Sequence, residues 1–484
     1  MKVEPSATAS RRAFLTAGGI AAAAGVAAGS GLGRPLPAEA AVIGTSGLEF
    51  DVTTYGAKGD GTTDDTIAIQ SALTAAMRAP GSSVVMPAGD FLVSTIGIDY
   101  SGASWPAQPE SGAPYGYPCP EFRGMGPRKT RLIQKSGSTG PILTVKGKTG
   151  TASGPANNNK ATGARISGME LVGTPSGGHG IHVQSAVNAA FENIWVRETG
   201  RSGVYLAREY FVSGVDDEYS YANSFARMKL VSNARWGVEC SGTTSIGASM
   251  YDIEAIGNAH GGFKLAPTNM NLYGCQAIGN GTANASGRGL LAVKNSNATS
   301  VNSALNLIGF RSEGNSAPGG YEIEIESGIG YAINVPSFYP TTGAHCIGIG
   351  LKSYGTAAYV LSLQVLGGYF GTHPTDFPKQ KAIVLGSDAR DTLIMNPRFT
   401  YNGSGLTPEA LIADSGFRTS VLMNSNLRFD PRGALVLSRE IARADSPKPK
   451  TGEARFYLGL SAGKKQQLLV QFESGAAQVV ATEP

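Results

Sequence analysis

The stretch FDVTTYGAKGDGTTDDTIAIQSALTAAMRAPGSSVVMPAGDFLV, residues 50–93, predicts a strand, a glycine loop, a helix and two further strands. Asp64 and Asp65 put negative charge on the first turn of this helix, where the helix dipole favours it, and Thr63 or Asp64 can act as its cap. Pro80-Gly81 ends the helix. We therefore interpret the acidic residues as turn and helix-start chemistry, and we expect the helix to cover an open β edge.

Three parts of this stretch carry a family resemblance: Tyr55 to Thr66 (YGAKGDGTTDDT), Ile69-Gln70, and Met86 to Val93 (MPAGDFLV). Together they resemble the opening of the right-handed parallel β-helix proteins of the pectin-lyase-like superfamily. That superfamily contains polygalacturonase-related enzymes, epimerase-like pectate lyases and phage tailspikes. The resemblance implies a fold, and it bears only loosely on chemistry, because one fold hosts many functions.

An internal repeat begins near residue 166 and supports the same fold. Each unit has an apolar-x-apolar run, a Gly/Asn-rich turn, a glycine and a second apolar-x-apolar run, which suits coils that bury their apolar faces by stacking. We predict an all-β, right-handed, single-stranded parallel β-helix with an N-terminal capping α-helix and a small C-terminal β module. The recurring glycines are Gly180, Gly203, Gly237, Gly262, Gly289 and Gly320.

The two ends of the chain differ from the repeats. Residues 1–41 are typical of a cleaved twin-arginine signal peptide, with Ser10-Arg11-Arg12-Ala13-Phe14-Leu15 before an Ala/Gly-rich apolar run and Ala38-Glu39-Ala40 at the cleavage site. We expect a protein secreted by a bacterium, with no membrane segment after cleavage. The predicted parts are the signal peptide (1–41), the β-helix (48–440), a linker (441–451) and the β module (452–484).

Charge and cysteine content exclude some functions. The formal net charge is +4, of which the signal segment holds +2, so the remainder carries about +2. A nearly neutral chain argues against nucleic-acid binding, which needs a clustered basic footprint. The four cysteines show no metal-binding or disulfide spacing, so we expect buried thiols and leave a disulfide open.

Side chains on a strand alternate between inside and outside, so the repeat register predicts outward columns along the solenoid. One inward column, from Met169 to Phe310, predicts the packed core. We expect a polysaccharide to lie along the outward columns. The first is Glu170, Trp195, Lys229, Glu254, Gln276 and Arg311; the second is His182, Tyr205, Glu239, Lys264, Leu291 and Glu322.

Glycosidic hydrolysis is the favoured chemistry at this stage, because it needs two carboxyl groups and aromatic residues to orient the sugar. An acidic, aromatic excursion at residues 208–223 and the nearby columns supply them. We expect no resident cofactor or metal. The candidate catalytic residues are Asp216, Asp217, Glu239, Asp252 and Glu254, and the candidate substrate-binding residues are Trp195, Tyr205, Tyr219, Tyr221, Arg227, Lys229 and Lys264.

Two alternatives stay open. A polysaccharide lyase would use a base and a cation next to a uronate carboxyl group, with calcium held by Asp216, Asp217 and Glu218 if a metal is used. A non-catalytic glycan-binding or tail-like adhesion protein could use the same scaffold. By analogy with tailspikes, the resemblance also implies a homotrimer.

One motif is set aside. Gly178-His179-Gly180 resembles the Gly-His-Gly of polygalacturonases, but the Asn-Thr-Asp and Asp-Asp that precede it in that family, and the Arg-Ile-Lys that follows, are missing here. Turn geometry explains the two glycines, so His179 is a weak catalytic candidate.

Overall fold

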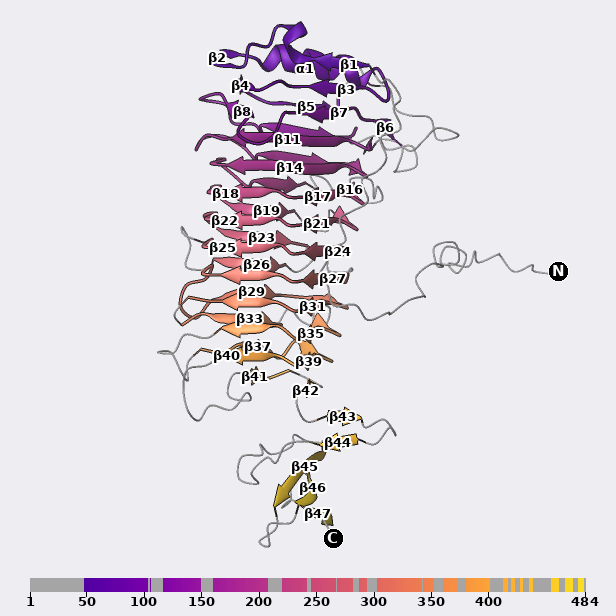
Figure 1. Ribbon diagram of the computed structural model, residues 1–484, viewed down its shortest axis with the longest axis vertical. Helices are drawn as coiled ribbons and strands as arrows, with labels where there is room; N and C mark the ends of the chain where they lie inside the picture. Colours follow the sequence, from indigo (N-terminus) through magenta and orange to yellow (C-terminus); the bar gives the residue numbers. More distant parts are fainter. Residues whose placement is uncertain are drawn as a thin grey trace, which may run out of the picture. The chain divides into compact units, whose positions relative to one another are not determined.

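The computed structural model describes residues 48–484 apart from 103–104, 106–115, 149–159, 208–219, 242–244, 267, 282–286, 294–302, 342, 352–359, 372–379, 401–411, 417–418, 423–426, 430–434, 438–453, 461–465, 473–477 and 483–484. Successive coils stack along one axis, with helix α1 (Thr66–Met77) at the N-terminal end (Figure 1). Strands of neighbouring coils pair in parallel. This confirms the predicted parallel β-helix with its capping helix and C-terminal β module.

Acidic residues organise the N-terminal cap through turn contacts, as predicted, but none of them lies in the first turn of α1. The Asp65 carboxylate accepts hydrogen bonds from the backbone N–H groups of Lys58 (2.7 Å) and Gly59 (3.0 Å), which ties the glycine loop to the start of α1. Asp64 accepts from the N–H of Thr66 at 3.1 Å. The residue at the cap position is Asp65, so the helix begins slightly later than the sequence suggested.

Each coil contributes one strand to an 11-stranded parallel sheet, and this sheet carries the site described below. Its strands are β5 (Ile96–Asp99), β9 (Leu143–Lys146), β12 (Ile181–Gln184), β15 (Val204–Leu206), β19 (Trp236–Cys240), β23 (Gly261–Leu265), β26 (Arg288–Ala292), β29 (Tyr321–Ile325), β33 (His345–Ile349), β37 (Ile383–Leu385) and β41 (Ile412–Asp414).

The other strands of each coil belong to a 31-stranded sheet that bends around the rest of the solenoid. One bend is a column of residues in the left-handed conformation, including Asn193, Arg227, Asp252 and Val335. Strands next to this bend are β11 (Arg165–Val172), β14 (Ala190–Arg197), β17 (Ser224–Ala226), β18 (Lys229–Val231), β21 (Ser249–Tyr251), β22 (Glu254–Ile256), β24 (Thr268–Tyr273), β25 (Gln276–Ile278), β27 (Ser303–Ile308), β28 (Arg311–Glu313), β31 (Ala332–Asn334), β32 (Ser337–Tyr339), β35 (Gln364–Leu366), β36 (Tyr369–Gly371) and β39 (Leu393–Met395).

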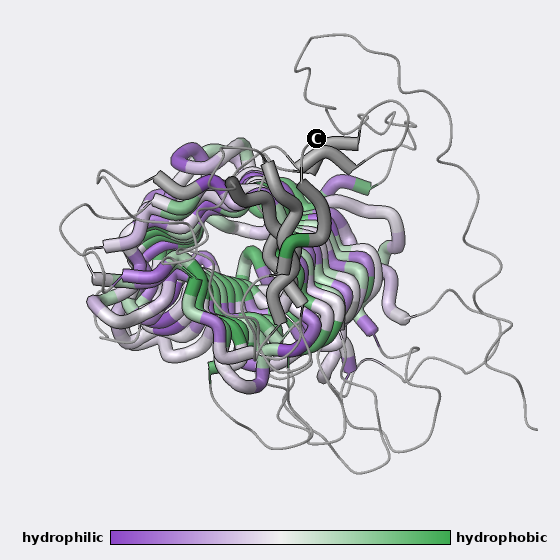
Figure 2. The backbone as a smooth tube through the Cα atoms, turned by 90° about the horizontal axis from the view of Figure 1, so that it is seen from below, coloured by the Kyte–Doolittle hydropathy of each residue, from purple (hydrophilic) through white to green (hydrophobic). Residues whose placement is uncertain are grey.

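The core fills the inside of the coils. Figure 2 shows hydrophobic residues on the inner wall of the tube and hydrophilic residues mainly outside. The predicted inward column is confirmed, since all of its members are buried, and Phe191 and Phe225 stack within the core at 4.9 Å between ring centroids. The inward column is Met169, Ile194, Met228, Ile253, Cys275 and Phe310.

A buried ladder of asparagine side chains joins the coils at the turn that leads into the 11-stranded sheet. The Asn258 amide donates to the Leu230 carbonyl (2.9 Å) and to Asn280 Oδ1 (2.8 Å). Its own Oδ1 accepts from the backbone N–H (3.1 Å) and the amide (2.8 Å) of Asn233. Asn280 repeats the pattern with Asn315, so each turn is fixed to the next.

Glu322 ends this ladder and corrects the predicted outward column. The strand register pairs Leu291 with Glu324, so Glu324 belongs to the column in place of Glu322. Glu322 instead occupies the position that is glycine in earlier coils, where a Cβ on Gly289 would lie 3.0 Å from the Asn315 amide. Its carboxylate accepts hydrogen bonds from the Asn315 N–H (2.9 Å) and amide (2.6 Å). Burial raises the pKa of Glu322.

The expected C-terminal strands are present, and the expectation of buried thiols holds for three of the four cysteines. The C-terminal module is an antiparallel sheet of β45 (Ala454–Leu460), β46 (Gln466–Phe472) and β47 (Gln478–Thr482). All four cysteines are free thiols, and all except the half-buried Cys119 are buried. In the described part of the chain, no helix is long and apolar enough to cross a membrane.

The asparagine ladder gives a stability prediction. Asn258→Ala leaves several buried groups without partners, at about 1–3 kcal/mol each, so we expect a loss of at least about 3 kcal/mol in the free energy of unfolding. Denaturant unfolding of the purified chain measures this. The control is Asn334→Ala on the outer surface of β31, which should cost well under ~1 kcal/mol. Equal losses for the two variants would contradict a stabilising role for the ladder.

Candidate functional site

The structure distributes the candidate residues over two faces of the solenoid. Trp195, Lys229 and Glu254 follow one another in register on the 31-stranded sheet, as predicted. Tyr205, Glu239 and Lys264 follow one another on the 11-stranded sheet. Asp216, Asp217 and Tyr219 lie outside the described residues, and Tyr221 is in β16 (Ser220–Tyr221) of the 31-stranded sheet. The candidates therefore do not form a single site.

The face of the 31-stranded sheet is occupied by ion pairs between neighbouring coils. Lys229 Nζ lies 2.9 Å from Glu254. Arg197 Nε lies 2.7 Å from the buried Glu170. Arg227 pairs with Glu192 in the coil before it. Each of these charges has a partner of opposite sign, as is typical of a solvated structural face.

Two further candidates on this face have local roles. The Trp195 ring has the Arg128 guanidinium 4.9 Å and the Lys229 ammonium 5.5 Å from its centroid, so cations already occupy positions over it. Asp252 has a φ of 51° and sits at a bend between β21 and β22. Strand alternation is broken there, so Asp252 and Glu254 are not successive outward residues of one strand.

The 11-stranded sheet gathers a different set of groups around Tyr205. The His179 ring stacks on Tyr205, with centroids 4.1 Å apart and an interplanar angle of 6°. His182, one coil before Tyr205 in the register, lies 5.5 Å from it. Glu239 and then Lys264 follow along the column. Imidazole, phenol, carboxylate and ammonium groups thus occupy four successive coils.

Glu239 is the electrostatic centre of this cluster. Its side chain is 5% exposed, and it accepts a 2.6 Å hydrogen bond from Ser202 Oγ. Lys264 Nζ lies 3.1 Å and Arg235 3.8 Å from its oxygens. Burial by itself raises the pKa of Glu239, but the Ser202 hydrogen bond and the two cations outweigh burial and lower it. The carboxylate is therefore ionised at neutral pH.

His179 is buried and neutral. Burial lowers its pKa to about 4, and this outweighs the opposite effect of Glu239. Its Nδ1 accepts a hydrogen bond from the Ser202 N–H at 3.2 Å, so the neutral ring carries its proton on Nε2. Since Nδ1 is engaged, His179 is placed to hold the Tyr205 ring rather than to accept a proton there.

A second aromatic and basic group lies further along the same sheet. Tyr321 and His345 have ring centroids 5.1 Å apart, and the Arg288 guanidinium is 5.8 Å from the Tyr321 centroid. Arg288 Nε donates to Glu324 at 2.6 Å. This face is therefore lined by aromatic and basic side chains well beyond Lys264.

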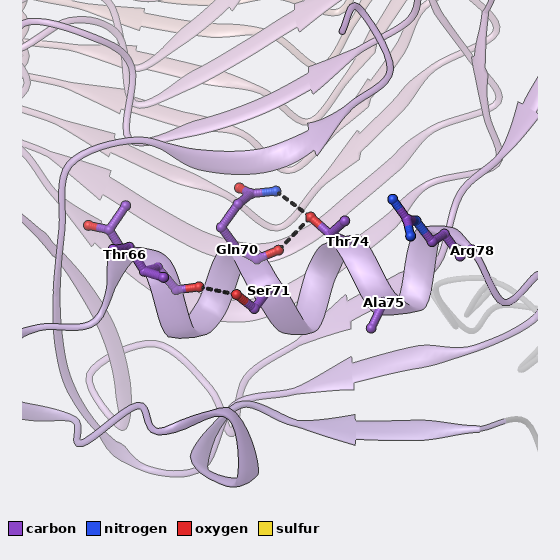
Figure 3. Close-up of a pocket in the computed structure, with 7 residues that line it drawn as sticks. Thr66, Gln70, Ser71, Thr74, Ala75 and Arg78 are labelled. Atoms are coloured by element: carbon purple, nitrogen blue, oxygen red, sulfur yellow. Dashed lines mark hydrogen bonds between the residues drawn. The ribbon is translucent and has the colours of Figure 1, made fainter. Parts of the chain in front are cut away.

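A surface hollow elsewhere lies along the outer side of α1 (Figure 3). Its hydroxyl groups are already used within the helix, since Ser71 donates to the Ile67 carbonyl and Thr74 to the Gln70 carbonyl, each at 2.7 Å. Gln70 reaches the backbone of Gly97. The hollow thus lacks the convergent polar groups that a catalytic site requires.

The described residues contain no group of three or more His, Cys, Asp and Glu side chains that could hold a metal ion. The residues named for calcium, Asp216, Asp217 and Glu218, are not among those described. A calcium requirement therefore stays a prediction that depends on lyase chemistry.

The fold and this face define a parallel β-helix protein with an aromatic and basic outer sheet. Residues 50–304 match the family described as rhamnogalacturonase A/epimerase, pectate lyase-like. This match covers more than half of the chain, so the chain belongs to that family.

Curated relatives match only a short part of the chain. Alginate lyase 7 of Azotobacter vinelandii is 53% identical over 47 residues, which is 10% of this chain and 6% of that protein. Mannuronan C5-epimerase AlgE4 of the same organism is 44% identical over 50 residues, 10% of this chain and 9% of that protein. The chain thus spans less than a tenth of the length of these relatives.

Among solved structures, ORF18 of Geobacillus virus E2 superposes with a TM-score of 0.50 at 15% identity, covering 90% of this chain and 76% of that one. The A-module of A. vinelandii AlgE4 superposes with a TM-score of 0.49 at 15% identity, covering 77% of this chain and 95% of that one. At this identity, the likeness to ORF18 shows the fold alone.

Sequence reasoning missed part of the cluster. His179 was set aside as a turn residue, and Ser202 and Arg235 were not considered. Each is close to the start of its strand, three or four residues before the Tyr205–Glu239 column. The signal available in the sequence was that all three residues lie close to the start of a strand. Recognising this signal requires knowledge of the register between coils.

Buried His179 gives a pH prediction. Its pKa is lowered in the folded state, so it favours folding above its ordinary value of 6.5, and this contribution is lost as pH falls toward about 4. The melting temperature should therefore fall less steeply between these pH values in His179→Gln than in the unsubstituted chain. The control is His260→Gln, at a half-buried histidine, which should keep the original slope. Parallel curves for His179→Gln would contradict the burial effect.

Proposed function

We propose that this chain is a secreted polysaccharide-degrading enzyme that cleaves a uronate-containing polymer by β-elimination on the outer face of the 11-stranded sheet. The observation that carries the proposal is the row His182, Tyr205, Glu239 and Lys264, with Arg235 beside it. Of the chemistries predicted from sequence, the lyase alternative suits these groups better than hydrolysis.

Charge distribution supports an acidic substrate. Around Glu239 on the 11-stranded sheet, Lys264 and Arg235 supply two positive charges against one carboxylate, whereas on the 31-stranded sheet Lys229 is matched by Glu254 alone. A local excess of positive charge attracts a polyanion and favours its binding along the face.

The proposed reaction assigns a task to each group. Lys264 and Arg235 neutralise the sugar carboxylate, which makes the neighbouring C–H bond more acidic. His182 removes that proton through Nδ1, because its Nε2 is buried, and the electron pair forms the new C=C bond as the bond to the glycosidic oxygen breaks. The Tyr205 O–H protonates the departing oxygen, while His179 holds the phenol ring in place.

Hydrolysis remains the second candidate, because one buried carboxylate is present. The lowered pKa of Glu239 suits a base or nucleophile, so the general acid would have to come from elsewhere. Asp216 and Asp217 are the sequence-predicted partners. A glycan-binding protein without activity is the third candidate and predicts retained binding with no product.

Product analysis tests the proposal. The purified chain is incubated with uronate-containing and neutral polysaccharides, and ultraviolet absorbance is followed together with new reducing ends. Elimination predicts unsaturated, absorbing products from acidic polymers. Reducing ends without absorbance would favour hydrolysis, and binding without any product would favour adhesion.

Tyr205→Phe tests proton transfer. Removing the phenol O–H should lower kcat by about 10²–10⁴-fold and leave KM nearly unchanged, since the ring and its stacking on His179 remain. The control is Tyr251→Phe on the 31-stranded sheet, which should keep full activity. An unchanged kcat in Tyr205→Phe would remove Tyr205 from the mechanism.

Lys264→Gln tests recognition of the carboxylate. Loss of a charged hydrogen bond worth about 1.5–3 kcal/mol should raise KM about tenfold or more and weaken its dependence on salt. Lys229→Gln is a matched control, since Lys229 also pairs with a glutamate, at 2.9 Å, but on the other face. Equal effects in the two variants would argue against substrate binding on the 11-stranded sheet.

A further inference from the structure

A second cluster of hydrogen-bond donors lies further along the 11-stranded sheet, beyond the groups of the proposed active site. Arg288, Tyr321 and His345 are the first residues of β26, β29 and β33, which follow one another in the stack of coils (Figure 1). Each is three residues before a member of the column that contains Tyr205, and His179 has the same place in its own coil. The cluster therefore repeats the position of His179 on three successive coils.

The two clusters are separated by more than the length of one sugar unit. Four strand spacings lead from β15, which carries Tyr205, to β29, which carries Tyr321, so the clusters are about 19 Å apart along the solenoid. A ligand that contacts both of them has to be an extended chain of several sugars.

Arg288 is fixed in place but keeps donors for a ligand. Its Nε donates to the buried Glu324 at 2.6 Å, and its Nη1 donates to the Gly287 carbonyl at 2.9 Å. These bonds use two of the five N–H donors of the guanidinium group. In the described part of the chain, Nη2 has no hydrogen-bond partner. The planar group is thus held rigidly and leaves one nitrogen for a ligand.

Tyr321 presents a hydroxyl group that the chain does not use. Its ring is held by the Arg288 guanidinium, 5.8 Å from the centroid, by the His345 ring at 5.1 Å, and by the Gly348 backbone, where an added Cβ would lie 2.7 Å from Cδ1. Burial raises the pKa of Tyr321, so the phenol keeps its proton. Among the described residues, no group accepts a hydrogen bond from this O–H.

His345 supplies a third donor. Its Nδ1 accepts a hydrogen bond from the Lys381 N–H at 2.9 Å, so the neutral ring carries its proton on Nε2. Burial lowers the pKa of His345, which keeps the ring neutral at neutral pH. The strands β26, β29 and β33 contain one histidine, so this cluster has no counterpart of His182, the proposed base.

We propose that Arg288, Tyr321 and His345 form a second subsite for the polysaccharide, which binds a uronate unit of the chain without reacting with it. All three groups donate, and donors of this kind bind an anionic carboxylate oxygen more strongly than a neutral one. Without a second imidazole, the subsite has no group to remove a proton from the sugar. It rests on the proposed function only for its ligand class, an acidic polysaccharide, and not on the reaction.

Two subsites on one rigid sheet favour long chains. Once a polymer is bound at the first cluster, its contact with the second is intramolecular and gains from a high effective concentration. Short oligosaccharides reach only one cluster at a time. The affinity should therefore rise steeply when the oligosaccharide is long enough to cover the roughly 19 Å between the clusters.

Calorimetric binding of uronate oligosaccharides of increasing length tests the subsite. The measurements use the Tyr205→Phe chain as the parent, so that the ligand is not consumed. The parent should show a step in affinity of at least about tenfold once both clusters are covered. Adding Tyr321→Phe and Arg288→Lys should remove most of this step. These changes delete the hydroxyl group and the planar fork, but they keep the ring and a positive charge opposite Glu324.

The matched control adds Tyr339→Phe and Arg311→Lys to the same parent. On the 31-stranded sheet, the Arg311 guanidinium also lies close to a tyrosine ring, 5.5 Å from the Tyr339 centroid, so the control makes the same chemical change on the other face. It should keep the full step. Circular dichroism checks that each variant folds.

Three results would overturn the proposal: a step of unchanged size after Tyr321→Phe and Arg288→Lys, an equal loss in the control, or no rise in affinity with length in the parent. The last result needs no variant of the second cluster, so it decides the question even where a variant fails to fold. Binding is measured without turnover, so failure of the elimination proposal is seen separately, in the product analysis.

Discussion

The fixed register between coils is the constraint on which the rest of this structure depends. Backbone pairing sets the spacing, and the buried ladder from Asn233 to Asn315 locks the turn of each coil to the next. The ladder lies immediately before the strands of the 11-stranded sheet. Since buried amides are costly to leave unsatisfied, any slip of one coil would break several hydrogen bonds at once. The ladder thereby fixes the relative positions of Tyr205, Glu239 and Lys264.

The asparagine ladder also explains why one position of the coil is glycine in several coils and glutamate in another. Glycine just before β15 and at the second residue of β19, β23 and β26 leaves room for the next turn, and a Cβ on Gly237 would lie 3.2 Å from the Asn258 amide. At Glu322 the position carries a carboxylate that accepts the final amide hydrogens. The ladder therefore ends with a partner for its last member, and the coils that follow continue without it.

The two outer faces use the same residue types differently. On the 31-stranded sheet, neighbouring charges such as Lys229 and Glu254 neutralise each other, and partial exposure makes each pair worth little energetically. On the 11-stranded sheet, Glu239 is buried beneath two cations and a serine hydroxyl. This second arrangement places proton-transfer groups beside two cations that share one carboxylate.

The sequence by itself determined the solenoid, the capping helix, the inward column and most of the outward columns, because stacking against neighbours imposes a repeated local pattern. It also supplied Tyr205, Glu239 and Lys264. Tertiary structure decided what the sequence could not: Glu322 turns inward, Asp252 lies at a left-handed bend, and Trp195 lies on a different face from Glu239. It also placed His179 against Tyr205. The physical reason is that the direction in which a side chain faces depends on the backbone bends and on the register between coils. Coil lengths vary with the loops, and the loops leave no periodic signal in the sequence.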